Sequence, residues 1–168
     1  MVLLGLMGSG KSTIGAALAA RLGRRFVDND DMLERRTGHS ARDIEAGSGL
    51  DVLHEDEARV LGDALASLEP VVIAAAAGSV LVPDSARHLG GHIVVYLRAE
   101  PETLAQRLAD NPGDEHRPFG GRSPVVVLRE QFAARDQTYR DLATIVVEES
   151  SRSPQEIVET IRSALEHP

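Results

Sequence analysis

The amino-acid sequence predicts an α/β fold of the doubly wound type, in which helices cover both faces of a parallel sheet. Two observations favour this class: strand and helix signals alternate along the whole chain, and the chain opens with a buried strand, a glycine-rich loop and a helix. No internal repeat, low-complexity segment or domain linker interrupts the alternation, so we expect a single domain over residues 1–168. A chain of this length can bury a sizeable core.

The opening segment carries the most specific pattern. Val2–Leu4 is an apolar run too short for an amphipathic helix, and it predicts a buried parallel strand. The next residues, 5–12, read GLMGSGKS and match G-x-x-x-x-G-K-[ST] in full. Apolar residues then recur four apart and predict a helix over 13–22. In this order the pattern is typical of a phosphate-binding loop, and the alternative is an ordinary glycine-rich turn that binds nothing.

The remaining elements follow from short apolar runs, amphipathic stretches and helix-stop residues. Further strands are predicted at 25–27, 71–77, 92–97 and 143–147. Further helices are predicted at 32–38, 39–46, 51–68, 101–108, 125–139 and 154–165. Residues 111–124, NPGDEHRPFGGRSP, form a charged loop rich in glycine and proline, which we expect to be a lid.

The glycine loop predicts a nucleoside triphosphate site. Its glycines allow consecutive N–H groups to point at phosphate oxygens, and the helix that follows adds its positive N-terminal end. Lys11 would reach the β- and γ-phosphates, and the Ser12 hydroxyl would help to hold Mg²⁺. The predicted nucleotide-binding residues of this loop are Gly8, Ser9, Gly10, Lys11, Ser12 and Thr13.

Composition limits the other functions that the chain can have. A formal net charge of −8 argues against nucleic-acid binding, and the absence of cysteine excludes disulfides, thiol nucleophiles and thiolate metal sites. No apolar run approaches the length of a membrane span, and no signal peptide precedes the first strand. We therefore expect a soluble cytoplasmic protein with no nucleic-acid or membrane partner, which works as a monomer.

Three groups of residues are predicted to meet at the carboxyl ends of the strands, where ligands bind in open α/β sheets. They are Ser9–Ser12 in the glycine loop, the acidic cluster Asp28–Asp31, and Gly78 after the predicted third strand. The sequence thus brings a phosphate loop and carboxylates to one edge of the sheet.

With these elements placed, the chain resembles the shikimate kinases, which are small P-loop kinases of the nucleoside monophosphate kinase structural type. The similarity spans nearly the whole chain and rests on GLMGSGKST, on FVDNDDMLERRTG, on Arg117-Pro118, and on Arg135 four residues before Tyr139. It implies a three-layer α/β/α fold of the P-loop NTPase type, with a five-stranded parallel sheet in the order 2-3-1-4-5. It also implies an acceptor-binding region at about 29–60 and a lid at about 111–124.

The resemblance implies an activity too. The family uses ATP and Mg²⁺ to phosphorylate a hydroxyl of a small cyclitol carboxylate, in aromatic amino-acid biosynthesis when the acceptor is shikimate. Asp28 would lie near Mg²⁺ with Ser12, and Asp30 would orient or deprotonate the acceptor hydroxyl. Arg117 would neutralise the transferring phosphoryl group together with Lys11.

Further roles follow from the same resemblance. Arg135 would bind a substrate carboxylate in a bidentate manner, beside His54, Ala77 and Gly78 in the acceptor pocket. Arg107 and Arg152 would face the adenine.

Each role has an alternative without function. Asp28 and Asp30 could be a helix N-cap and a solvated charge of the first turn, and Arg117 could be solvated in its loop. Arg135 could pair with an acidic neighbour on its own helix, and Arg107 and Arg152 could be surface charges.

The chain departs from the family pattern on the acceptor side. Ala76-Ala77-Gly78 stands in place of three glycines, and His54 stands in place of an arginine that helps to hold the shikimate carboxylate. Glu45 replaces an aromatic wall residue. Three interpretations stay open: a shikimate kinase, a related kinase for another polyol, sugar acid of the gluconate type or cyclitol, and a nucleotide-binding module without catalysis.

Overall fold

The computed structural model describes residues 1–82, 85–111, 119, 121–149 and 152–167. The strands are β1 (Val2–Leu4), β2 (Arg25–Asp28), β3 (Val71–Ala74), β4 (Val94–Arg98) and β5 (Ile145–Glu148). The helices are α1 (Lys11–Leu22), α2 (Asn29–Thr37), α3 (Ala41–Ser48), α4 (Leu50–Leu65), α5 (Ser85–Leu89), α6 (Pro101–Asp110), α7 (Pro124–Leu142) and α8 (Pro154–Glu166). No helix of this described part is long and apolar enough to cross a membrane.

The strands form one five-stranded sheet in the order β2-β3-β1-β4-β5, and every pair is parallel. β1 lies at the centre, with Leu3 opposite Ala74 on one side and Val95 on the other. The strand order changes direction at β1, so the loop after β1 opens at a topological switch point. The predicted α/β/α fold and strand order are confirmed.

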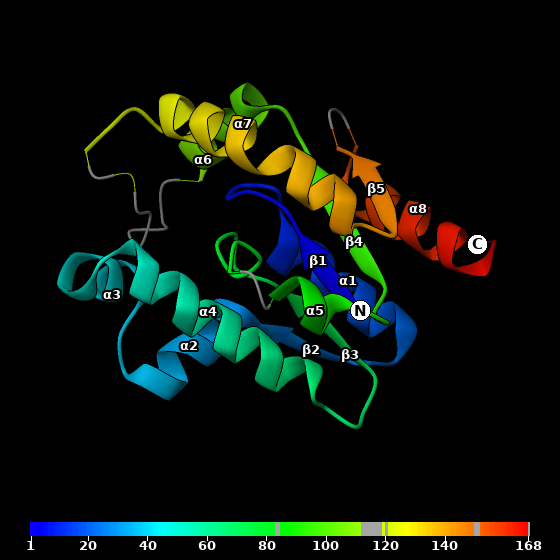
Figure 1. The fold of residues 1–168 in the computed structure, drawn as a ribbon. Coiled ribbons are helices and arrows are strands. Elements are labelled where there is room, and N and C mark those ends of the chain that lie inside the picture. The colour runs from blue at the N-terminus through cyan, green and yellow to red at the C-terminus, as the bar shows by residue number, and fades with distance from the viewer. Residues whose placement is uncertain (83–84, 112–118, 120, 150–151, 168) are drawn as a thin grey trace.

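Helices cover both faces of the sheet (Figure 1). On one face, Ile14 and Leu18 of α1 and Ile157 and Ile161 of α8 pack on the sheet around the fully buried Val95. On the other face, α4, α5, α6 and α7 pack over the alternate strand residues. Successive residues of a strand point to opposite faces, which is why the central strands are apolar throughout.

Several predicted boundaries need correction. The third strand ends at Ala74 rather than Ala77, because Ser79 caps a turn by donating its N–H and hydroxyl to the Ala76 carbonyl. The third helix begins at Ala41, after a capping box between Ser40 and Asp43, and α4 ends at Leu65. The sequence signals did not predict α5, which has only five residues.

Candidate active site

The glycine loop lies between β1 and α1, as predicted. Gly8 and Gly10 have φ values of 83° and 75°, in the left-handed region that favours glycine. Gly10 caps α1 and no side chain accepts a hydrogen bond from the first turn of that helix. The free N–H groups and the positive end of α1 therefore form an anion-binding site.

Lys11 folds back onto its own loop. Its ammonium donates to the carbonyls of Gly5 at 2.9 Å and Leu6 at 3.2 Å. Burial lowers the pKa of Lys11, and the nearby carboxylates, Asp30 foremost, oppose that shift. A bound phosphate would give this ammonium a stronger partner than two neutral carbonyls.

Ser12 and Asp28 meet at the mouth of the loop. The Ser12 hydroxyl donates to Asp28 Oδ2 at 2.6 Å, and Asp28 Oδ1 accepts the Asp30 N–H at 3.1 Å as the N-cap of α2. A hydroxyl and a carboxylate are the oxygen ligands that Mg²⁺ prefers. No group of three or more His, Asp or Glu residues suited to a metal occurs in the described residues, so phosphates and water would supply the other ligands.

Two side chains of α7 fix the turn after β3. The Tyr139 hydroxyl donates to the Ala77 carbonyl at 2.6 Å, and Arg135 Nη1 donates to the same oxygen at 3.3 Å. Arg135 is only 9% exposed, and among the described residues no carboxylate forms an ion pair with it. Within the described residues, Arg135 therefore does not form the ion pair on its own helix that was the alternative to substrate binding.

Gly78 allows close packing on this side. A Cβ at Gly78 would come within 2.1 Å of His54 Cδ2 and 2.5 Å of Glu57 Oε2, both from α4. Burial lowers the pKa of His54, and the positive charge of Arg135 lowers it further. His54 is therefore a neutral ring where the family pattern has a cation.

Glu57 belongs to this group, although sequence reasoning missed it. It lies three residues after His54, one turn further along α4, and is 6% exposed. Burial, and secondarily the charge of Asp30, raises the pKa of Glu57 to about 8, while Arg135 and Lys11 oppose the shift. In the sequence, only its spacing from His54 indicated that it belongs to this group. A carboxylate in a helix is otherwise expected to face solvent.

The remaining predicted residues lie outside the group formed by Arg135, His54 and Gly78. Arg107 contacts Glu149 and approaches the Gly8 carbonyl of the phosphate loop, so it lies beside the nucleotide side. Arg152 donates to Thr160 of α8 at 3.3 Å. Thr13 is exposed in the first turn of α1, and Arg117, like most of the predicted lid, lies outside the described residues.

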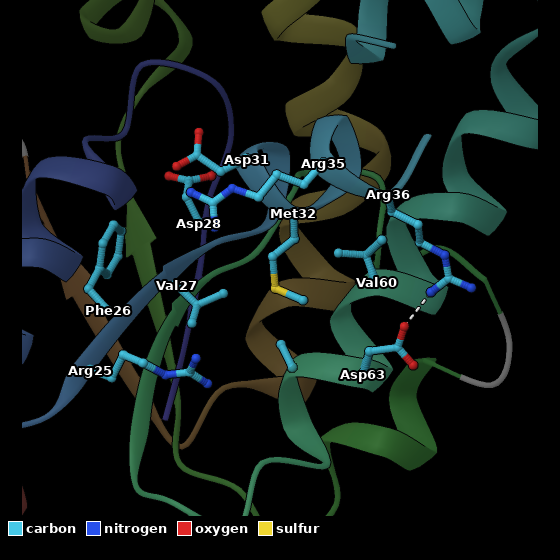
Figure 2. Close-up of a pocket in the computed structure, with 11 residues that line it drawn as sticks. Arg25, Phe26, Val27, Asp28, Asp31, Met32, Arg35, Arg36, Val60 and Asp63 are labelled. Atoms are coloured by element: carbon cyan, nitrogen blue, oxygen red, sulfur yellow. Dashed lines mark hydrogen bonds and ion pairs between the residues drawn. The ribbon is translucent and has the colours of Figure 1, made fainter. Parts of the chain in front are cut away.

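A separate cavity of about 730 Å³ lies beside the edge strand β2, between α2 and α4 (Figure 2). Met32 and Val60 contribute to its apolar floor, and Arg25 and Arg35 line its rim. It shares Asp28 with the phosphate site, but Asp30, Arg135 and Gly78 do not line it. Several of its lining residues, among them Asp31, Met32 and Val60, fall within the predicted acceptor-binding region of about 29–60.

Comparisons with known proteins agree with this geometry. A family model described as shikimate kinase matches residues 7–166. A shikimate kinase of Thermobifida fusca (strain YX) is 37% identical over 164 residues, which cover 98% of this chain and 93% of the relative. A solved shikimate kinase from Acinetobacter baumannii, in complex with shikimate, is 30% identical with a TM-score of 0.90 and covers 98% of this chain and 90% of its own.

A gluconokinase provides a contrast. The solved enzyme from Sinorhizobium meliloti 1021 is 25% identical with a TM-score of 0.71, and the match covers 98% of this chain and 90% of that one. Both measures are lower than for the A. baumannii shikimate kinase. The likeness is thus greater to the shikimate kinase than to this sugar-acid kinase.

Proposed function

The chain belongs to the shikimate kinase family, and on that premise we propose that it transfers the γ-phosphoryl group of ATP to a hydroxyl of shikimate. It is a phosphotransferase with an alcohol group as acceptor. The phosphate loop would hold ATP, and the acceptor would lie between Asp30 and Arg135.

The burial of Arg135 without a carboxylate partner among the described residues is the observation that most supports an acidic acceptor. A guanidinium buried away from water is costly unless an anion pairs with it, and here Arg135 Nη1 donates to the neutral carbonyl of Ala77. A carboxylate matches its planar fork with two parallel hydrogen bonds. The acceptor's own carboxylate would complete this site.

The roles at the reacting end are proposed as follows. Asp30 orients the acceptor hydroxyl and takes its proton, since the attacking oxygen must be held in line with the γ-phosphorus. Lys11 leaves the Gly5 and Leu6 carbonyls and binds the transferring phosphates, and Arg117 neutralises the same charge from the opposite side.

Mg²⁺ is the proposed metal, bound through Ser12 and Asp28. The ion would supply positive charge between the β- and γ-phosphates. The 2.6 Å contact between the Ser12 hydroxyl and the Asp28 carboxylate supports the assignment, because it places the two oxygens side by side at the mouth of the loop.

The direct test is a coupled ADP-release assay with ATP, Mg²⁺ and a panel of acceptors: shikimate, quinate, gluconate, and neutral and amino cyclitols. The expected result is turnover with shikimate. Tight ATP binding with no turnover of any acceptor would contradict the proposal and favour a nucleotide-binding module without catalysis. Size-exclusion chromatography of the same protein checks the expected monomer.

Asp30→Asn tests the proposed base. We expect kcat to fall by about a thousandfold, because proton transfer by a positioned carboxylate contributes roughly 10²–10⁴ in rate. ATP affinity should change little. Asp31→Asn is the matched control, since Asp31 lies one residue further along α2 and lines the cavity at the sheet edge. Wild-type turnover in Asp30→Asn would remove Asp30 from the mechanism.

A second candidate is a related kinase for another polyol, sugar acid or cyclitol. The neutral, half-buried ring of His54 favours it, because the acceptor side then offers the Arg135 guanidinium and no cation at position 54. Turnover with a neutral or amino cyclitol and none with shikimate would establish this candidate in place of the first.

A further inference from the structure

Glu149 is a fully buried carboxylate outside the acceptor pocket. It follows the last residue of β5 directly and is 0% exposed. Its backbone N–H donates to the Arg98 carbonyl of β4 at 2.8 Å, which fixes its position at the end of the sheet. A carboxylate buried to this degree is costly unless a cation pairs with it.

That cation is Arg107 of α6, which binds Glu149 at two points. Arg107 Nη1 donates to Glu149 Oε2 at 2.5 Å, and Nη2 donates to the Glu149 carbonyl at 3.3 Å. The guanidinium is thus held on one edge by the side chain and backbone of a single residue. About a third of the Arg107 side chain stays exposed, whereas its partner is wholly covered.

The same guanidinium reaches the phosphate loop. Arg107 Nη1 lies 3.5 Å from the carbonyl oxygen of Gly8. The loop and α6 are in close contact at this point, because a Cβ on Gly8 would stand 3.1 Å from the Leu104 carbonyl and 3.2 Å from Leu108 Cγ. Strand β5, helix α6 and the phosphate loop therefore meet through one side-chain pair.

We propose that Glu149 is a positioning residue of the nucleotide site, which holds the Arg107 guanidinium against the phosphate loop and so sets the affinity for ATP. The inference rests on the proposed function, because it takes the glycine loop as the ATP site. Glu149 itself is fully buried, so its effect would pass through Arg107, which is partly exposed and lies beside the Gly8 carbonyl of the loop.

The charge arrangement explains why a carboxylate is needed there. The ammonium of Lys11 lies within electrostatic range of Glu149, so the buried carboxylate balances two cations at the base of the loop. Without it, the Arg107 guanidinium would have only carbonyl acceptors and would turn toward solvent.

The experiment measures ATP binding by titration calorimetry in the absence of acceptor, and steady-state kinetics with shikimate beside it. For Glu149→Gln we expect the Kd and KM for ATP to rise about tenfold, as for the loss of a charge-assisted hydrogen bond. The KM for shikimate and the value of kcat should stay within about twofold. Glu148→Gln is the matched control, because its carboxylate is half exposed and pairs with Arg98 instead.

A double-mutant cycle with Arg107→Gln separates positioning from a general loss of packing. If Glu149 acts through Arg107, adding Glu149→Gln to Arg107→Gln changes the Kd for ATP no further. The double variant also removes both buried charges, so it keeps the test open if Glu149→Gln alone fails to fold. Additive losses, or an unchanged Kd in a folded Glu149→Gln variant, would overturn the inference.

The two proposals fail in different ways. Calorimetry without acceptor reports on Glu149 whichever compound is phosphorylated, whereas the acceptor panel reports on the reaction. Wild-type protein that binds ATP but does not phosphorylate shikimate would refute the proposed acceptor and leave the role of Glu149 to be decided by the cycle.

Discussion

Glu57 is the side chain whose protonation most affects the charge of the acceptor pocket. It is 6% exposed, it stands beside His54 and Gly78, and its pKa is raised from 4.5 to about 8. At neutral pH the Glu57 carboxyl therefore keeps its proton.

This protonation predicts how the stability of the empty protein depends on pH. The folded pKa of Glu57 is raised, so the unfolded state loses the proton at lower pH than the folded state does. Between about pH 5 and pH 8 the free energy of unfolding should fall with rising pH, by up to about 1.4 kcal/mol per unit from this group. Glu57→Gln should flatten that slope, measured by urea unfolding at several pH values.

The neighbouring acid on the same helix supplies the control. Glu55 is exposed on α4, so Glu55→Gln should keep the slope of the wild-type protein. Equal slopes in wild type and Glu57→Gln would show that Glu57 titrates normally. The acceptor pocket would then carry one more negative charge than we infer.

Helix α7 connects the acceptor side to the sheet. It spans Pro124–Leu142, and two of its buried side chains, Arg135 and Tyr139, hold the Ala77 carbonyl after β3. The ring of Tyr139 also packs edge-on against Tyr96 of β4, with centroids 5.1 Å apart. One face of this helix thus positions both Arg135, the arginine proposed to bind the acceptor carboxylate, and the turn that carries Gly78.

Tyr139→Phe tests the helix as a positioning element. The variant keeps the ring packing but removes the 2.6 Å hydrogen bond to the Ala77 carbonyl, so the turn loses one of its two fixed points. We expect the KM for shikimate to rise about fivefold, in line with the loss of one buried hydrogen bond, while the KM for ATP is unchanged.

Tyr96→Phe is the matched change on the other ring. Its hydroxyl donates to Asp136 at 2.8 Å, away from Ala77, and Arg98 and Arg140 still bind that carboxylate after the substitution. This variant should lose some stability and keep its KM for shikimate. A parallel rise in both variants would mean that packing, rather than the bond to Ala77, sets acceptor affinity.

The fold was largely predictable because its signals are local and repeated. Strands β1, β3 and β4 lie in short apolar runs, and the glycine loop fixes where the first strand and helix lie. The end of β3 was predicted three residues too far on, since alanines continue the apolar run while Ser79 starts a turn. Hydrophobicity alone does not distinguish a strand from a buried turn.

The site was predictable only where a motif carries the chemistry. The motifs pointed to Ser12 and Asp28, which meet in the structure, whereas Glu57 and Glu149 were given no role, because their burial depends on packing between distant elements. Arg152 was predicted from the resemblance to face the adenine, and in the structure its guanidinium donates to Thr160 of α8. A charged residue acquires its role from its partners in three dimensions.

Nucleotide binding should stabilise the whole domain, because the loop joins the central strand to α1 and contacts α6. At an ATP concentration about one hundred times Kd, binding adds about 2.7 kcal/mol, or roughly 5–10 °C in Tm for a chain of this length.

Lys11→Ala should lose most of that shift, since the ammonium is the cation that would meet the phosphates. Without nucleotide it should unfold within a few degrees of the wild-type Tm, because the burial of the ammonium offsets its two hydrogen bonds and its attraction to nearby carboxylates. Differential scanning calorimetry with and without ATP and Mg²⁺ measures both effects, and an equal ATP shift in Lys11→Ala would place the nucleotide away from the glycine loop.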